Sequence, residues 1–90
     1  MTSILFVDDD RRVLSGLRRQ LHGCNPEWSL SFAPGGPEGV AALDESPPDV
    51  VVTDMKMPML DGAQLLQHSV DNHPHVARLV LSGEADPDRR

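Results

Sequence analysis

The sequence predicts one α/β domain in which helices cover both faces of a doubly wound, parallel β-sheet. The first observation is a pair of apolar runs without alternation, at residues 4–7 and 50–53, which is typical of strands buried on both faces. The second is that segments with apolar residues at helical spacing separate the predicted strands along all 90 residues. Right-handed crossovers between such strands give a parallel sheet between two layers of helices.

The first half of the chain supplies two strands and one helix. After the strand at residues 4–7, residues 11–23 form a helix with Gly23 as its stop, and its apolar stripe consists of Val13, Leu14, Leu17 and Leu21. Residues 28–33 then alternate large apolar with small side chains. This alternation predicts a half-covered strand near one edge of the sheet.

The second half repeats the alternation of helix and strand. Pro37 can begin a short helix that runs through Glu45, and the buried strand at residues 50–53 follows it. Asp61 is a suitable N-cap for a third helix that closes at His73. We expect its inner side to carry Ala63, Leu65, Leu66 and Val70. Residues 77–81 give a last strand.

Composition excludes several classes of function. The net charge of −6 disfavours direct binding of nucleic acid, because Lys and Arg supply most of the affinity for phosphate backbones. No apolar run approaches the ~20 residues of a membrane span, so no membrane partner is expected. Cys24 has no second cysteine to pair with, and no secretory signal pattern begins the chain. A cytoplasmic location is therefore the expectation.

Acidic residues follow the predicted buried strands directly. Asp8 and Asp9 end the first strand, Asp54 ends the third, and Ser82 ends the fourth. In doubly wound sheets the functional groups gather at the carboxyl ends of the strands. We therefore expect these side chains to lie together, although Asp8 and Asp54 are far apart in the sequence.

Crowded carboxylates need a proton or a cation beside them. At roughly 4 Å and an effective dielectric near 20, each like-charged pair repels by about 4 kcal/mol. Ligands that offer only oxygen favour a hard ion, and Mg²⁺ commonly takes one or two carboxylates and keeps its waters. A carboxylate beside such an ion can attack phosphorus, and the Ser82 hydroxyl would add a hydrogen-bond donor for a phosphoryl oxygen.

Other polar residues are better explained by local structure. Asp10 and Asp61 stand where helices begin, where negative charge is favoured, so we interpret both as helix caps. The histidines show no metal-ligand spacing and are interpreted as surface residues: His22, His68, His73 and His75.

Three sequence motifs, in order, resemble those of the response-regulator receiver domain, the CheY-like family of two-component signalling. They read ILFVDDD at residues 4–10, VVTDMKMPMLDG at 51–62 and LVLSG at 79–83. The resemblance covers nearly the whole chain, from residue 4 to about residue 86. It implies the flavodoxin-like receiver fold.

The resemblance also implies a role for each matching position. Asp54 would be the phosphoacceptor, served by a partner histidine kinase, and the phosphorylated domain would switch an output domain or downstream protein. Asp9 would ligate Mg²⁺ directly and Asp8 mainly through water, while Lys56 would contribute its backbone carbonyl. Ser82 would contact the phosphoryl group. The family domain catalyses its own phosphotransfer and dephosphorylation.

Some family features would lie beyond Arg90. Members carry a fifth strand and a fifth helix, together with a Lys and an aromatic switch residue on that strand. The expectation is that residues 1–90 form a receiver domain truncated at its C-terminal end, with transfer competence dependent on the missing Lys. Without the fifth strand, residues 77–81 would present an unpaired edge, and a homodimer in which two copies cover each other is the alternative to a longer chain.

Two other functions compete with this interpretation. A receiver-like interaction module that is never phosphorylated would have the same fold, although the retained acidic pair speaks against it. A small phosphohydrolase of the haloacid-dehalogenase type also begins with a strand that runs into Asp-x-Asp, which Asp8 and Asp10 match. Arg11 and Arg12 depart from that motif, and the chain is too short for that fold.

Overall fold

The protein, as a computed structural model, is described over residues 1–81. Strands and helices alternate along this range, and four strands and three helices lie in it. In chain order they are β1 (Thr2–Val7), α1 (Arg11–Leu21), β2 (Trp28–Ala33), α2 (Gly36–Glu45), β3 (Val50–Thr53), α3 (Gly62–Asn72) and β4 (Ala77–Val80). The element order is the one predicted from the sequence.

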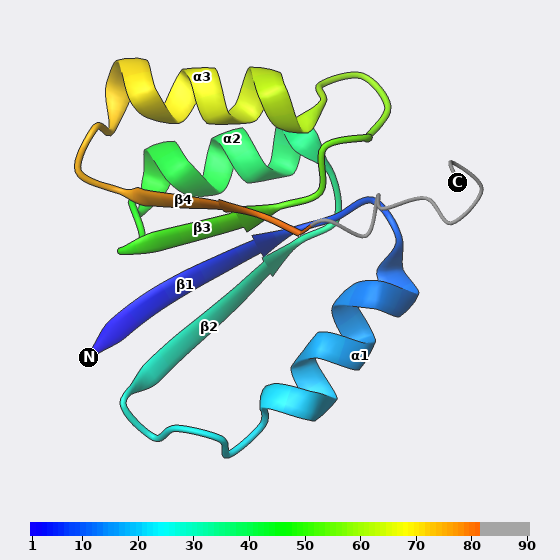
Figure 1. Cartoon of the computed structure of the whole chain (residues 1–90), viewed down its shortest axis with the longest axis vertical. Coiled ribbons are helices and arrows are strands. Elements are labelled where there is room, and N and C mark those ends of the chain that lie inside the picture. Colours follow the sequence, from blue (N-terminus) through cyan, green and yellow to red (C-terminus); the bar gives the residue numbers. More distant parts are fainter. Residues whose placement is uncertain (82–90) are drawn as a thin grey trace, which may run out of the picture.

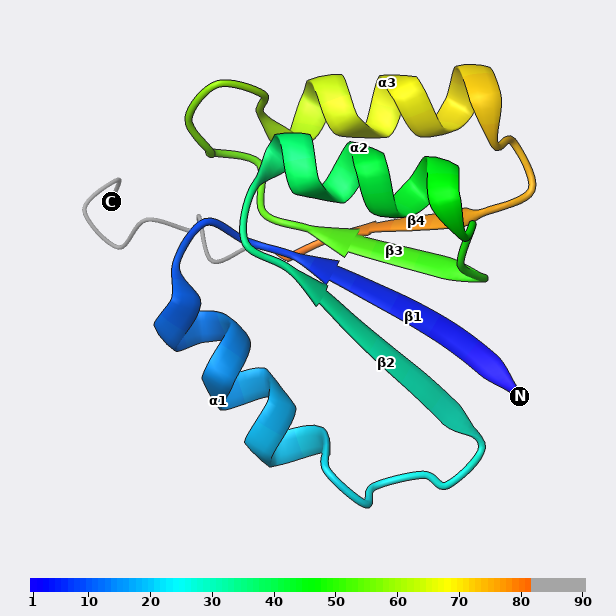
Figure 2. The same cartoon turned by 180° about the vertical axis from the view of Figure 1, so that it is seen from behind.

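The strands form one parallel sheet in the order β2-β1-β3-β4. The order reverses direction after β1, which makes the fold doubly wound and confirms the predicted class. β2 lies at an edge, as its alternating pattern predicted. Figures 1 and 2 show α2 and α3 side by side on one side of the sheet, where α2 packs against β1 and β2, whereas α1 lies away from both helices.

Each face of the sheet has its own apolar core. Alternate residues of a strand point to opposite faces, so Leu5 and Val7 of β1 belong to one core and Phe6 to the other. The larger core, under α2 and α3, contains Leu5, Val7, Ala33, Leu43, Val51, Met57, Leu65 and Val76. The smaller core, beside α1, has Phe6, Leu14 and Val52 as its buried residues. Both predicted buried strands therefore lie between two covered faces.

The buried stripe of α3 differs from the predicted one. Leu65 is fully buried and Leu66 packs against the core, but Ala63 and Val70 are exposed. Gly62 and Ser69 take the inner positions instead. The helix is turned in this way because Gly62 fits directly against the backbone after β3, and because Arg78 donates a hydrogen bond to the Ser69 hydroxyl at 3.4 Å. The pattern of apolar and polar residues along α3 does not predict either contact.

Helix ends differ by small amounts from the prediction. α1 ends at Leu21, two residues before Gly23, which has a left-handed φ of 73° in the following turn. α3 begins after Asp61 and is capped by His73, as expected. Among residues 1–81, no helix is long and apolar enough to cross a membrane.

Candidate functional site

Three carboxylates meet at the carboxyl ends of β1 and β3. These strands pair in parallel with Val7 opposite Thr53, so the residues that follow them emerge side by side. The Asp54 amide donates a hydrogen bond to the Val7 carbonyl at 3.1 Å, which extends the pairing by one residue. Carboxylate oxygens of Asp8, Asp9 and Asp54 consequently lie within 4.8 Å of one another. This is the grouping that the strand-end pattern predicted.

Asp8 is the most buried member of this acidic cluster. Only 6% of the residue is exposed, and its Oδ1 accepts a hydrogen bond from the Asp10 amide at 2.9 Å. Burial raises the pKa of the Asp8 carboxyl above its ordinary value, and the charges of Asp54 and Asp9 raise the pKa further, while the Asp10 amide opposes them. The folded chain therefore pays an electrostatic cost when Asp8 is ionised.

Asp54 is held by the loop that leaves β3. The amide of Lys56 lies 3.4 Å from Asp54 Oδ1, so the backbone of Lys56 is beside the carboxylate while the residue itself is exposed. The Thr53 hydroxyl donates to the Asp54 carbonyl at 2.9 Å. This bond fixes the peptide plane at the strand end, and with it the direction in which Asp54 leaves the sheet.

The start of α3 supports the same loop. A reciprocal capping box joins Asp61 and Gln64, with both hydrogen bonds at 2.9 Å. Gly62 donates to the Met55 carbonyl at 2.9 Å, and a Cβ at Gly62 would meet the Asp54 carbonyl oxygen and would come within 2.6 Å of Met55 Cα. Only glycine allows the helix to start this close to the backbone of the acidic cluster.

The acidic cluster opens onto solvent. A hollow of about 490 Å³ is lined by Asp8, Asp9, Asp10, Val13, Leu17, Asp54 and Leu81. Like charges 4.8 Å apart repel by about 3 kcal/mol per pair at an effective dielectric of 20, and solvent at the exposed Asp9 reduces this. The donor set offers oxygen alone, which fits a hard divalent cation such as Mg²⁺.

Asp10 belongs to α1 rather than to the cluster of three. Its carboxylate accepts from the Arg12 amide at 2.9 Å and pairs with the Arg12 guanidinium at 3.2 Å. These hydrogen bonds from Arg12 lower the pKa of the Asp10 carboxyl. The structure thus confirms its interpretation as a helix cap.

A comparison with known families matches residues 4–90 to the response regulator receiver domain. The chain belongs to this family. As a receiver domain of two-component signalling it belongs to a class of proteins that work with histidine kinases in general.

Curated receiver proteins match nearly the whole chain. The transcriptional regulatory protein QseB of Haemophilus influenzae is 34% identical over 87 residues, which is 97% of this chain and 38% of that protein. The DNA-binding transcriptional regulator NtrC of Salmonella typhimurium is 33% identical over 85 residues, which is 94% of this chain and 18% of that protein. The receiver chain therefore spans less than two fifths of the length of these two relatives.

Solved receiver structures match the fold as well as the sequence. A response regulator receiver domain protein from Clostridium thermocellum superposes with a TM-score of 0.83 at 32% identity, covering 99% of this chain and 71% of that one. The receiver domain of nitrogen regulatory protein C gives a TM-score of 0.77 at 31% identity, covering 97% and 68%. Ser82, the remaining predicted site residue of this receiver, lies outside the described residues.

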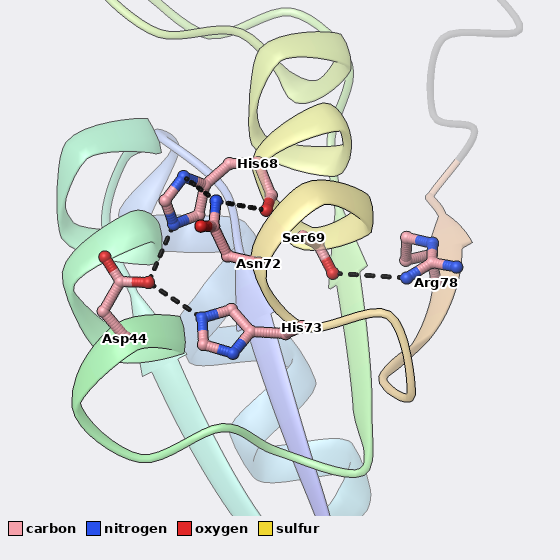
Figure 3. A network of polar contacts seen from close by, with 6 residues as sticks. All are labelled: Asp44, His68, Ser69, Asn72, His73 and Arg78. Atoms are coloured by element: carbon pink, nitrogen blue, oxygen red, sulfur yellow. Dashed lines mark hydrogen bonds and ion pairs between the residues drawn. The ribbon is translucent and has the colours of Figure 1, made fainter.

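A second cluster in this receiver was missed by the sequence interpretation. His68 and His73, interpreted as surface residues without ligand spacing, both approach the carboxylate of Asp44 (Figure 3). The five-residue separation of the two histidines does not bring them to one face of a continuous helix. They meet because α3 ends at Asn72 and because Asp44 comes from another helix. The spacing of residues within one helix cannot predict a contact that depends on a second helix.

Proposed function

We propose that Asp54 accepts a phosphoryl group from a partner histidine kinase and that the phosphorylated chain switches an output domain or downstream protein. The observation that carries this proposal is the convergence of Asp8, Asp9 and Asp54 at one edge of the sheet. Membership of the receiver family supports the kinase as the class of phosphodonor. The retained acidic cluster favours this function over that of an unphosphorylated interaction module.

Mg²⁺ is the cation that we propose for the cluster. The carboxylates of Asp8, Asp9 and Asp54 would hold it, with the backbone carbonyl of Lys56 as a further ligand. When bound, it supplies positive charge against the transferring phosphoryl group. The oxygen-only donor set and the mutual repulsion of the three carboxylates support this choice over a softer metal.

Asp54 has the exposure and the surroundings that a nucleophile requires. It is half-buried and lines the solvent-open hollow, so a phosphodonor can reach its carboxylate. In the proposed transfer a carboxylate oxygen attacks phosphorus, the P–N bond of the donor phosphohistidine breaks, and the imidazole leaves with the electron pair. The product is an acyl phosphate on Asp54. The Ser82 hydroxyl would donate a hydrogen bond to one of its oxygens.

The output is proposed to lie outside residues 1–81. QseB and NtrC are named as transcriptional regulators, whereas a similar receiver structure from Pseudomonas fluorescens, 29% identical with a TM-score of 0.84, comes from an HD domain-containing protein. One receiver fold thus serves different outputs. The net charge of −6 supports a receiver that acts through another domain or protein rather than by binding nucleic acid itself.

Phosphorylation with a small-molecule phosphodonor tests the proposal, in a version of the protein extended past Arg90 so that the Lys expected there is present. With Mg²⁺ present, we expect one phosphoryl group per chain, located at Asp54 by peptide mapping after reduction of the acyl phosphate. Asp54→Asn removes the nucleophile and should abolish the label. Asp9→Asn keeps the nucleophile but should lower labelling at least tenfold, because a ligand of the neutralising cation is lost.

Asp10→Asn is the matched control. This residue borders the same hollow, but it caps α1, and asparagine caps a helix equally well. Labelling should therefore stay at the wild-type level. Label that persists in Asp54→Asn, or labelling that is equal with Mg²⁺ and with a chelator, would contradict the proposal.

A further inference from the structure

A second cluster of ligand-type side chains joins the ends of α2 and α3. Nε2 of His68 and Nε2 of His73 each lie 2.8 Å from the same oxygen, Oδ1 of Asp44. Figure 3 shows the two rings approaching this carboxylate with their Nε2 edges. The ring centroids are 6.0 Å apart and the planes are tilted by 58°, so the rings are not stacked on each other. The two ring nitrogens therefore converge on one carboxylate oxygen.

The backbone at the end of α3 creates this convergence. His73 caps the helix with φ −138° and ψ 63°, and its amide still donates to the Ser69 carbonyl at 2.7 Å. The chain therefore leaves the helical path at His73, which brings its ring back toward His68. Asp44 comes from the last turn of α2, directly across from both rings.

The arrangement has the composition and spacing of a metal-binding site. Two imidazole nitrogens and one carboxylate oxygen are ligands typical of three-residue zinc sites, in which water takes the fourth position. The three ligand atoms lie within 4.8 Å of one another. Ligands around a tetrahedral Zn²⁺ lie about 3.3 Å apart when the bonds are near 2.0 Å, so each 2.8 Å contact needs to lengthen by about half an ångström.

Exposure also suits such a site. The two rings are mostly covered, at 28% exposure for His68 and 14% for His73, whereas Asp44 is 51% exposed. The rings are thus held in place from the protein side, and solvent reaches the carboxylate side, where a water ligand would enter. We propose that Asp44, His68 and His73 bind Zn²⁺ with one open position, and that the ion ties the end of α2 to the end of α3.

Asn72 can support the metal-bound form. Without metal, Nε2 of each histidine donates to Asp44, and Nδ1 of His68 faces the Asn72 amide nitrogen at 3.3 Å. Zinc takes the Nε2 lone pair, so the ring proton moves to Nδ1, which then needs an acceptor. The Asn72 amide nitrogen also donates to the His68 carbonyl at 3.0 Å, so its oxygen reaches Nδ1 only if the side chain rotates away from that carbonyl. A partner of this kind typically changes metal affinity by about 10 to 100-fold.

Isothermal titration of the full chain with zinc chloride tests the site. The protein carries Cys24→Ser, which removes the exposed thiol, and excess Mg²⁺ is present to compete at the acidic cluster. We expect one Zn²⁺ per chain. His68→Gln and His73→Gln keep a side-chain donor for Asp44 but lack the imidazole, and each should weaken binding more than about 100-fold, beyond the loss from a supporting residue.

His75→Gln is the matched control, because His75 lies close in sequence to His73 but outside the cluster. The zinc affinity of this variant should equal that of the parent protein. Long-range proton–nitrogen NMR gives a second measurement that needs no variant. Zinc should change the tautomer of His68 and His73 and leave His22 and His75 unchanged. Equal affinity in His68→Gln and the parent, a tautomer change at His22 or His75 instead, or no binding at millimolar zinc would overturn the proposal. Loss of binding in Asp9→Asn but not in His73→Gln would also overturn it, by placing the ion at the acidic cluster.

Discussion

Two clusters of ligand-type side chains lie at opposite ends of the strands, at what we call the acidic edge and the histidine edge of the sheet. They differ in how their charges and hydrogen bonds are arranged. The acidic cluster, Asp8, Asp9 and Asp54, follows the carboxyl ends of β1 and β3. The histidine cluster, Asp44, His68 and His73, lies where α2 and α3 end and the chain returns to β3 and β4 (Figure 1). The first gathers three groups of like charge. The second places two hydrogen-bond donors on one carboxylate.

Because of this difference, the ionised carboxylates at the two edges have opposite effects on the stability of the folded state. The burial of Asp8 beside two more carboxylates raises the pKa of Asp8, so its ionisation opposes the folded state until a cation arrives. At the other edge, hydrogen bonds from His73 and His68 lower the pKa of Asp44, so its ionised form supports the folded state without any metal. The acidic edge is arranged at the expense of stability, as is common at functional sites.

The largest effect is expected from Gly62→Ala, which disturbs the acidic edge directly. The added methyl group would collide with the Asp54 carbonyl and with Met55 Cα, and backbone atoms cannot rotate away. Overpacking of this kind costs about 3 kcal/mol at the upper end of its usual range. Urea unfolding should show this loss, and the amide resonances of Asp54 and Met55 should shift more than those of His68 and His73 at the far end of α3.

Gly16→Ala is the control for this substitution. Gly16 lies inside α1, and nothing stands within 4 Å of its added Cβ, so the variant should gain about 0.5 to 1 kcal/mol from helix propensity. A Gly62→Ala protein as stable as the wild type would show that the α3 start does not constrain the acidic cluster.

The acidic edge could be predicted from the sequence because it depends on topology. Apolar runs marked the buried strands, and parallel strands place their following residues at one edge, so Asp8, Asp9 and Asp54 were predicted together. The caps at Asp10 and Asp61 were also predictable, because each depends on neighbours within three residues. The roles of these aspartates in phosphotransfer and metal binding stay predictions.

The histidine cluster could not be predicted in the same way. It needs the rotation of α3, which Gly62 and Ser69 set by close packing rather than by polarity. It also needs the exact residue at which the helix ends, and helix ends are the least certain part of a pattern. The wrong placement of Val70 on the inner side of α3 has the same cause.

A smaller effect is expected from Asp8→Asn in a buffer with a metal chelator. The amide keeps the hydrogen bond from the Asp10 backbone but removes a charge from the crowded edge. Relief of repulsion across 4.8 Å, reduced by solvent, predicts a gain of about 1 kcal/mol in the free energy of unfolding at pH 7. Added Mg²⁺ should then raise the melting temperature of the wild type but not that of the variant.

The pH dependence gives this prediction its sign. A carboxyl whose folded pKa is raised does not lower the free energy of unfolding while it is protonated. It lowers this free energy as the pH rises through the folded pKa. The advantage of Asp8→Asn should therefore vanish below about pH 4. Asp10→Asn, at a carboxyl whose pKa is lowered by Arg12, should not stabilise the protein at any pH. A destabilised Asp8→Asn at pH 7 would contradict the electrostatic account of this edge.

The smallest effect is expected from Asp44→Asn, with the opposite dependence on pH. Hydrogen bonds from His73 and His68 lower the folded pKa of Asp44, so its contribution is present above the unfolded value of 3.8 and is lost as the pH falls through the folded pKa. Asp44 is half-exposed, which keeps the contribution below that of Asp8. Urea midpoints between about pH 5 and pH 2 should fall more steeply for the wild type than for Asp44→Asn. Parallel curves for the wild type and Asp44→Asn would mean that the histidine edge contributes no charge-dependent stability, and the contrast between the two edges would then rest on the acidic cluster alone.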